Sequence, residues 1–402
     1  MVTQNDESHA PLLDSTAGWI ATGATFVSTF TVFGVAYSFG EFFGPMADEF
    51  GTDRTQTSLI FAITTFLYFL LGAVTGHIAD KRGARPVLVF GAAAITVGLL
   101  LTAEVSSIEV GYATYGLGVG IGVACAYVPM VAAVGGWFVR RRAAAVGLAV
   151  AGIGVGTLTV VPIAGWLISE LGWRQTYRWM ALASGVLLLL AAVGAKRPPI
   201  TATGDEPSPW RRVADADARF WILYVSIVFV SMALFTPFVY MADFVDTEGI
   251  DGSAAVLVGI IGVASVVGRL GLGALASFTS PVRLYQVSLG VMAASFVVWL
   301  TLGSTYSALV VFAVILGASY GGFIALSPVV TAHLFGVSGL GATLGALYTA
   351  AGFGGLFGPP LVGYVIDGFG FNRGILAALI SGFMGTALLA LPQINRPHPS
   401  TP

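Results

Sequence analysis

Long apolar segments alternate with short polar ones along almost the whole chain. A helix needs about 20 mostly apolar residues to cross the hydrocarbon core of a bilayer, and twelve segments have roughly this length. The pattern therefore predicts an all-α membrane protein with twelve transmembrane helices. We expect them at residues 18–45, 55–78, 86–104, 108–135, 143–169, 176–195, 220–243, 254–276, 282–303, 306–332, 341–366 and 373–391.

The polar segments divide this pattern into parts. The opening residues carry Asp6, Glu7 and Asp14 and no basic stretch before a short apolar core, so they do not resemble a cleaved signal peptide. One longer polar segment with several prolines separates the sixth helix from the seventh and reads as a linker. We expect a tail, a six-helix half, the linker, a second six-helix half and a tail at residues 1–17, 18–195, 196–219, 220–391 and 392–402.

The two predicted halves repeat each other in their glycines and prolines. Shifts of 198 to 200 positions align the fourth helix with the tenth and the fifth with the eleventh. The aligned pairs are Gly118 and Gly317, Gly122 and Gly321, Pro129 and Pro328, Gly147 and Gly345, Gly152 and Gly352, Gly154 and Gly354, Pro162 and Pro360, and Gly165 and Gly363. Two parallel repeats predict a rocking secondary transporter whose site lies between the halves at the midplane.

Composition supports a membrane protein without a metal or cofactor. The chain is 56% hydrophobic and 9% charged, with a mean hydropathy of +0.88, whereas soluble domains are about 25% charged. Its 53 glycines suit helices that pack through small residues. The single Cys125 excludes a disulfide framework, and the four histidines are scattered. We expect no cofactor, no metal and no nucleic-acid partner, and a chain that works as a monomer in the lipid bilayer.

Basic residues orient the chain, because short cytoplasmic loops retain Lys and Arg. With the N-terminus inside, thirteen of the eighteen basic residues fall on the inner side and four on the outer side, and Arg269 lies within a span. We therefore expect a multi-pass protein of the plasma membrane with both termini in the cytoplasm. The four outer residues are Arg54, Arg174, Arg178 and Arg373.

The sequence lacks the motifs expected of two other classes of membrane protein. An ATP-driven pump needs a phosphate-binding loop that ends in GK and a Ser or Thr, but neither Lys81 nor Lys196 follows a glycine. An intramembrane enzyme should show paired carboxylates, a metal cluster or a nucleophile with a base, and the predicted spans offer almost no such chemistry. Secondary transport is therefore favoured over an intramembrane enzyme or a non-transporting receptor.

The loop between the second and third helices carries a motif. The stretch GHIADKRGARP resembles the motif GxxxDRxGRR of the major facilitator superfamily, and so implies that fold. The residues that carry it are Gly76, Asp80, Lys81, Arg82, Gly83 and Arg85. A carboxylate beside arginines can hold one conformation and release in another. By resemblance, Asp80 latches the halves on the inner side; alternatively, these charges are solvated. The second half has Ser277 instead of the acid, so an asymmetric latch is expected.

The junction of the fourth and fifth helices carries a more specific motif. The stretch WFVRRRAAAVGLAVAG, residues 137–152, resembles the signature YFxKRRxLAxGxAxAG of the monocarboxylate transporter family. Eight of its eleven specified positions are identical, two are conservative replacements and Ala144 departs. A second family signature survives only as Gly18 and Trp19. We expect the basic residues of this loop, Arg140, Arg141 and Arg142, to belong to the cytoplasmic gate with Asp80, Arg82 and Arg85.

Arg269 is the main candidate for binding a substrate. A guanidinium at the centre of a span costs roughly 3 kcal/mol, so it usually faces a cavity and a partner of opposite charge. Its planar fork binds a carboxylate in bidentate fashion. Related monocarboxylate and oxalate transporters carry a substrate-binding arginine in this helix, and the resemblance assigns that role to Arg269. The alternative is a permanent salt bridge with Glu41, the one acid well inside a predicted span.

Helix depth selects the side chains that can join Arg269. At about 1.5 Å per residue, Arg269 lies roughly 22 Å and Tyr320 roughly 21 Å from the outer ends of their helices. Tyr127 and Tyr348 fall at comparable or slightly deeper levels, so the three tyrosines are expected in one layer with Arg269. Their hydroxyls could orient a carboxylate while their rings exclude water. The expected apolar wall consists of Ile153, Ile324 and Ala351.

The residues do not identify the coupling ion. Animal members of the family pair the arginine with an Asp four residues earlier and use a first-helix Lys, whereas this chain has Ser265 and no such Lys. Either the substrate brings the proton and Arg269 gates the reorientation, or Glu41 titrates at the outer gate. Proton symport of lactate or pyruvate is the first hypothesis. Exchange of organic anions such as oxalate or formate is the rival.

Overall fold

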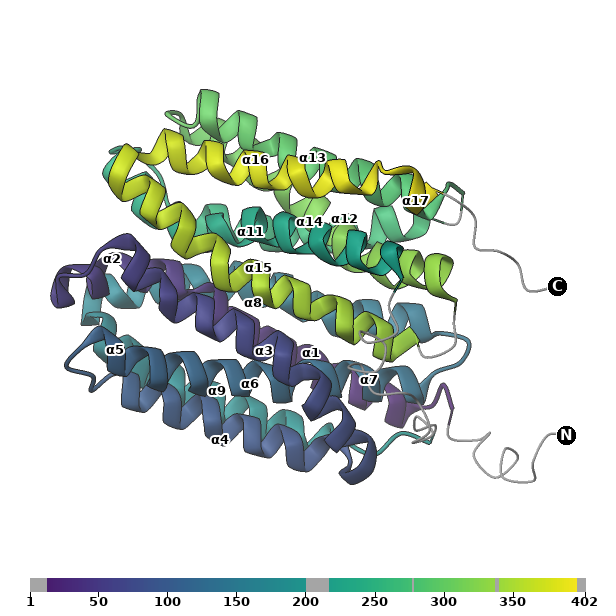
Figure 1. Cartoon of the computed structure of the whole chain (residues 1–402). Helices are drawn as coiled ribbons and strands as arrows, with labels where there is room; N and C mark the ends of the chain where they lie inside the picture. The colour runs from purple at the N-terminus through teal and green to yellow at the C-terminus, as the bar shows by residue number, and fades with distance from the viewer. Residues whose placement is uncertain (1–12, 200–216, 277, 337–339, 396–402) are drawn as a thin grey trace, which may run out of the picture.

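The protein is described by a computed structural model in which residues 13–199, 217–276, 278–336 and 340–395 are placed. These residues form two bundles of helices that lie side by side, and the start of α1 and the end of α17 lie at the same end of the molecule (Figure 1). We call that end the terminal end and the opposite one the distal end. The remaining residues, which include most of the predicted linker and both tails, lie outside the described part of the chain.

The helices of each half follow one another with short connections. The N-terminal half contains α1 (Thr16–Tyr37), α2 (Phe39–Phe50), α3 (Arg54–Arg82), α4 (Ala84–Thr102), α5 (Ile108–Gly111), the π-helix η2 (Tyr112–Leu117), α6 (Gly118–Ala126), α7 (Val128–Trp137), α8 (Arg142–Leu171) and α9 (Trp173–Gly194). The C-terminal half contains α11 (Ala218–Thr247), α12 (Ala254–Leu275), α13 (Pro281–Leu302), α14 (Tyr306–Phe335), α15 (Leu340–Phe369), α16 (Phe371–Leu389) and α17 (Pro392–Asn395).

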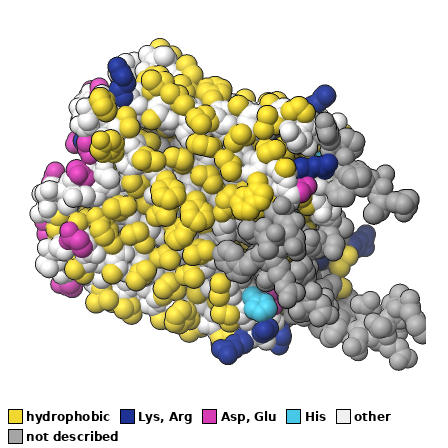
Figure 2. Space-filling model, in the orientation of Figure 1, with side chains coloured by type: hydrophobic (Ala, Val, Ile, Leu, Met, Phe, Trp, Pro, Cys, Tyr) yellow, Lys and Arg dark blue, Asp and Glu magenta, His cyan; other side chains and the backbone are white. Residues whose placement is uncertain are grey.

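In the described residues these helices make twelve spans, which confirms the predicted all-α membrane fold. The fourth span combines α5, η2, α6 and α7, and the first combines α1 and α2. The first differs most from its predicted bounds because it continues to Phe50, where Phe39, Phe42, Phe43 and Met46 bury one face of α2. Figure 2 shows hydrophobic side chains across the broad side of the molecule and charged ones at its ends, as a bilayer requires.

The turns between helices repeat in the two halves. Gly172 joins α8 to α9 with φ of +79°, and Gly370 joins α15 to α16 with φ of +82°. This backbone region is unfavourable for residues that carry a Cβ atom, so glycine is required where the chain reverses within one residue. The fifth and sixth helices of each half are thus connected in the same way, as the sequence repeat predicts.

Two spans are interrupted near the centre of the molecule. The break between α1 and α2 falls at Ser38, and the break between α6 and α7 falls at Tyr127. The second break follows from Pro129, because proline has no N–H to donate to the carbonyl of Cys125 and its ring crowds that turn. Interrupted helices are frequent at the binding sites of transporters, so both breaks indicate where a site lies.

The most extensive contacts between the halves follow two seams, and α2 also contacts α11. In one, α3 lies along α15; in the other, α8 lies along α12. We call them the α3–α15 seam and the α8–α12 seam. Glycines allow close approach in both. A Cβ atom on Gly154 would collide with the backbone of Gly262 across the α8–α12 seam, and one on Gly355 would collide with Thr65 across the α3–α15 seam.

Candidate functional site

Arg269 lies on α12 at the boundary between the halves. Its side chain is buried, and its Nη1 donates a hydrogen bond of 2.7 Å to the carbonyl oxygen of Val150 on α8. Its guanidinium lies 5.8 Å from the centre of the Tyr320 ring, within reach of a cation–π interaction. Its Nε has no hydrogen-bond partner among the described residues. The arginine therefore connects the halves and keeps one donor unsatisfied.

The charge of Arg269 is not balanced by a described carboxylate. The ion pairs between described residues involve Arg54, Arg174 and Arg178, all near the distal end. Glu41, the acid that could have formed a permanent salt bridge, lines a cavity at the distal end instead. A buried cation without a fixed counter-charge is suited to bind an anion reversibly.

The three tyrosines predicted to share the layer of Arg269 are brought together. Tyr127 lies at the α6–α7 break, Tyr320 on α14 and Tyr348 on α15. Each of them interacts electrostatically with the guanidinium of Arg269. Tyr320 is buried, whereas Tyr127 and Tyr348 are partly buried. The layer estimated from helix depth therefore exists as a cluster, and contact of its hydroxyls with a substrate stays a prediction.

Two further tyrosines belong to this cluster and were not predicted. The hydroxyl of Tyr37, beside the α1–α2 break, lies 3.0 Å from that of Tyr320, and its ring stacks on Phe238 at 4.2 Å. The hydroxyl of Tyr68 on α3 is buried and has no partner among the described residues. Tyr68 has nearly the depth used to select the others, roughly 20 Å from the predicted outer end of its helix, whereas Tyr37 lies only roughly 12 Å from its predicted outer end because that span continues to Phe50. Together with Tyr127, they place three tyrosines of the N-terminal half in this cluster.

Ile153, Ile324 and Ala351 were predicted to form the apolar wall of the binding site, and this role stays a prediction. Ile153 lies one helical turn from Val150, and it is buried. Ile324 lies one turn beyond Tyr320 and is partly buried, while the buried Ala351 lies one turn beyond Tyr348. Residues one turn apart share a helix face, so all three flank groups of the cluster.

The predicted cytoplasmic latch lies at the terminal end. Asp80, Arg82 and Arg85 are exposed around the turn between α3 and α4. The guanidinium of Arg197 donates hydrogen bonds to the backbone carbonyls of Asp80 and Lys81. This contact joins the start of the linker to the α3–α4 turn and does not reach the C-terminal half, so a bond from Asp80 to that half stays a prediction. Ser277, its counterpart, lies outside the described residues.

The basic loop at residues 140–142 binds Asp14, which lies just before α1. The carboxylate of Asp14 accepts hydrogen bonds of 3.2 Å from the backbone N–H groups of both Arg140 and Arg141. Desolvation opposes them, yet these hydrogen bonds hold the pKa of Asp14 below its usual range. The Nε of Arg142 donates to the carbonyl of Phe138. Arg140 and Arg141 thus bind Asp14 through their backbone and Arg142 binds Phe138 through its side chain, and the role of the three arginines in a gate stays a prediction.

The distal end joins the halves by an ionic cluster that we call the Arg54 clamp. Arg54 begins α3 of the N-terminal half. Its Nε lies 2.6 Å from Asp243 on α11, and its Nη1 lies 3.1 Å from Asp367 on α15. Both acids belong to the C-terminal half, so one arginine holds two of its helices. The clamp was not predicted, because pairing across the halves leaves no local sequence signal.

The fold and the buried arginine between two helical halves define a membrane transporter. The chain belongs to the Major Facilitator Superfamily, whose family model matches residues 24–305. The class of enzymes is thereby excluded. Within the superfamily, the chain belongs to the monocarboxylate transporter family, as its signature at residues 137–152 indicates.

Individual relatives support this membership over most of the chain. Monocarboxylate transporter 13 of Rattus norvegicus is 30% identical and the match covers 87% of this chain and 82% of the relative. Monocarboxylate transporter 12 of Xenopus laevis is 27% identical over 95% of this chain and 89% of the relative. The fold also matches a bacterial homologue of the human lysosomal transporter Spinster in its inward-facing, unoccupied conformation. That match has a TM-score of 0.76 and 13% identity and covers 94% of this chain and 97% of the other.

Proposed function

We propose that this transporter moves a small monocarboxylate, such as lactate or pyruvate, across the plasma membrane as a proton symporter. The terminal end and both chain termini face the cytoplasm, and the distal end faces outside. Transport proceeds by alternating access, in which the halves rock about the layer that holds Arg269. The names of the relatives motivate the substrate class, and the positive-inside rule supplies the orientation.

The unbalanced charge of Arg269 is the observation that carries the proposal. A carboxylate with two equivalent oxygens matches the guanidinium fork, and the free Nε offers one of the donors. The second donor would come from Nη1 or Nη2, with Nη1 exchanging its bond to Val150 for one to the substrate. The substrate would thus take over a contact that now joins the halves. The hydroxyls of Tyr37, Tyr68 and Tyr320 lie near Arg269 and would orient the carboxylate oxygens of the substrate.

The Arg54 clamp supports assigning this conformation as inward-facing. With the distal end joined by ion pairs across the halves, substrate would enter and leave at the terminal end. We therefore take the distal closure as the outer gate. Asp80 and the basic loop residues would act at the inner gate, when that end closes in the opposite conformation.

Uptake of labelled lactate into proteoliposomes under an imposed pH gradient tests the proposal. Charge-assisted hydrogen bonds are worth about 1.5–3 kcal/mol each, so Arg269→Ala should lower uptake by about 100-fold or more. Arg178→Ala is the control, because this arginine pairs with Glu104 inside the N-terminal half and should leave uptake nearly unchanged. Equal uptake by the Arg269→Ala variant would remove the site assignment. Unlabelled acids as competitors would rank the substrates.

Anion exchange is the second candidate, and one observation favours it. Arg269 has Ser265 one turn earlier, at a weak distance of 3.5 Å, and no described acid beside it to carry a proton. An exchanger needs a second anion on the opposite side, whereas a symporter needs only a proton. Uptake into vesicles without internal anion therefore separates them: rapid uptake driven by acid outside supports symport, and uptake only after preloading with oxalate or formate supports exchange.

A further inference from the structure

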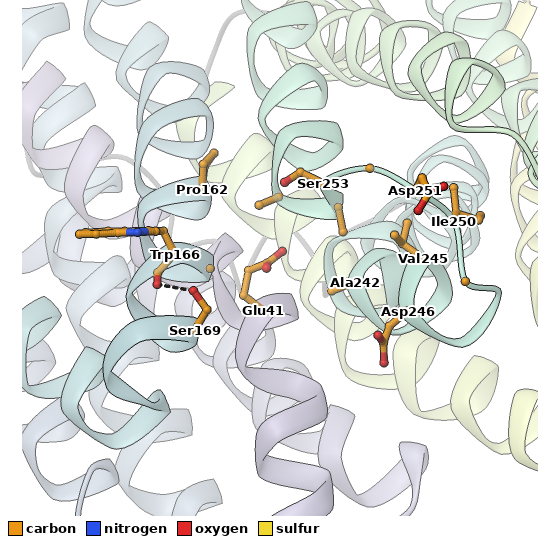
Figure 3. A pocket seen from close by; sticks show the side chains of 15 residues that line it. Glu41, Pro162, Trp166, Ser169, Ala242, Val245, Asp246, Ile250, Asp251 and Ser253 are labelled. Carbon is orange, nitrogen blue, oxygen red and sulfur yellow. Dashed lines mark hydrogen bonds between the residues drawn. The ribbon is translucent and has the colours of Figure 1, made fainter.

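A cavity of about 720 Å³ opens at the distal end between the two halves. Helix α2 and helix α8 form one wall, and the end of α11, the start of α12 and the segment between them form the other. It lies on the α8–α12 seam, away from the layer of Arg269. In Figure 3 the side chain of Glu41 points from α2 into the space between these walls.

The carboxylate of Glu41 has no hydrogen bond and no ion pair with any described residue. The side chain is partly buried, and Gly165 of α8 lies beside it. A Cβ atom on Gly165 would come within 2.8 Å of Glu41 Oε2, so the glycine leaves room for the carboxylate. A carboxylate that is partly removed from water and has no partner is less stable in its ionised form than one in bulk water, so it favours binding a proton.

The charged groups around Glu41 do not supply a partner. Among the described lining residues, the other titratable ones are Asp246 at the end of α11 and Asp251 in the segment before α12, both exposed and both acidic. Helix α8 contributes uncharged residues such as Trp166 and Ser169, and α12 contributes alanines. The arginines that approach α2 from its other neighbours are engaged: Arg174 of α9 pairs with Glu49, and Arg54 of α3 pairs in the clamp.

A cation occupies the position in the α3–α15 seam that corresponds to the Glu41 cavity of the α8–α12 seam. Arg54 is the first residue of α3, and Ala254 is the first residue of α12, the matching helix of the C-terminal half. Asp367 lies two residues before the end of α15, and Ser169 lies two residues before the end of α8. Where one seam has a guanidinium between carboxylates, the other has an alanine, a serine and the cavity with Glu41.

We propose that Glu41 is a proton-binding site on the distal face and that its protonation favours closure of the distal end. The proton takes the place that a guanidinium holds in the α3–α15 seam. When the distal end opens further, more water surrounds the carboxylate and stabilises its ionised form; when the distal end closes, the neutral form is favoured. Acid on the distal side therefore drives closure, and alkali favours opening.

This inference rests on the proposed function in one respect only, namely that the distal face is the outer one. With that orientation, protons from outside close the outer gate over a bound carboxylate, which couples a proton gradient to uptake. The change in shape itself does not depend on any substrate. It can therefore be measured without one.

Spin labels across the distal opening test the proposal on the full chain in lipid nanodiscs without substrate. Ser106→Cys and Ser304→Cys place one label in each half, at exposed distal turns, with Cys125→Ser as background. The distance should be measured by electron resonance while the pH rises from about 5 to about 9, which covers ordinary and burial-raised carboxyl titration. The parent should move from a short to a longer distance. Glu41→Gln should keep the short distance at all pH values.

Matched variants make the outcome decisive. Asp246→Asn and Asp251→Asn remove the exposed acids of the same cavity and should retain the parental pH dependence. Glu41→Asp keeps a titratable group and should also respond to pH, which guards against misfolding of the Gln variant. A parental response in Glu41→Gln, or loss of the response in either Asn variant, overturns the proposal. So does a response that follows sodium concentration at constant pH, since that would make the site one for a metal cation.

Transport measurements separate this inference from the proposed function. If lactate uptake needs Arg269 but the distal distance ignores Glu41, the carboxylate function stands and the proton site falls. If no carboxylate is transported yet the distance still follows Glu41, the proton site stands and the substrate assignment falls. Glu41→Gln should retain lactate exchange between equal concentrations while losing acceleration by a pH gradient.

Discussion

The two seams between the halves are built from pseudo-equivalent helices but close the molecule differently. The α3–α15 seam ends distally in the Arg54 clamp, where one guanidinium meets two carboxylates. The α8–α12 seam ends distally in an open cavity with the unpaired Glu41, and its middle carries the bond from Arg269 to Val150. One seam thus holds a cation paired with two carboxylates, and the other holds a cation and a carboxylate that have no ion pair among the described residues.

Because of this difference, the two seams of a repeated fold contribute unequally to closing the distal end. If both seams carried a permanent clamp, the closed distal end would be stable whether or not substrate and proton were bound. If neither did, the closed state would lack a fixed contact. An asymmetric pair leaves the balance between the two conformations sensitive to what occupies the α8–α12 seam.

Among substitutions that alter the packing or the ion pairs of the two seams, one that forces the α8–α12 seam apart should have the largest effect. A Cβ atom on Gly154 would meet the backbone of Gly262 and lie 2.6 Å from Val266, so Gly154→Leu should cost about 1–3 kcal/mol through overpacking. We expect about tenfold or greater loss of uptake and a lower melting temperature in detergent. Gly23→Leu is the control, because no atom lies within 4 Å of a Cβ there. Equal loss in both variants would show that the effect is not specific to the seam.

A smaller effect is expected from opening the clamp of the other seam. Arg54 and its acids are partly exposed, so solvent weakens each pair, and removal of the arginine should cost about 1 kcal/mol. Arg54→Ala should therefore shift the ratio of closed to open distal ends by about fivefold, measured with the distal spin labels. Arg178→Ala, which breaks a pair within one half, should not change the ratio. If it does, the distal distance reports general loosening.

The smallest effect is expected from making the seams alike. Ala254→Arg places a guanidinium in the cavity with Glu41, as Arg54 is placed in the other seam. A new, partly exposed pair is worth about 0.5 kcal/mol, so closure at neutral pH should gain about twofold and become less sensitive to pH. Combining Ala254→Arg with Glu41→Gln should abolish the gain. A gain that survives the second substitution would mean that the arginine acts through other groups.

The fold and the depth of most groups in the cluster around Arg269 can be derived from the sequence alone. Span length and apolar composition leave the chain no stable alternative to membrane helices, because unpaired backbone groups cannot be exposed to lipid. The glycine and proline repeat fixed the relation of the halves, and helix depth placed Tyr127, Tyr320 and Tyr348 with Arg269. Depth is predictable because a helix rises by a constant amount per residue.

The groups that face one another across the halves are known only once the helices are packed in three dimensions. The pairing of Arg54 with Asp243 and Asp367 joins residues far apart in sequence, and no local pattern marks it. The sequence left Glu41 open as a partner of Arg269; the structure places it in a separate distal cavity, and Arg269 on the carbonyl of Val150. Rotation of a helix about its axis and the offset of one half against the other are set by side-chain packing, and these two quantities determine partners that depth alone does not.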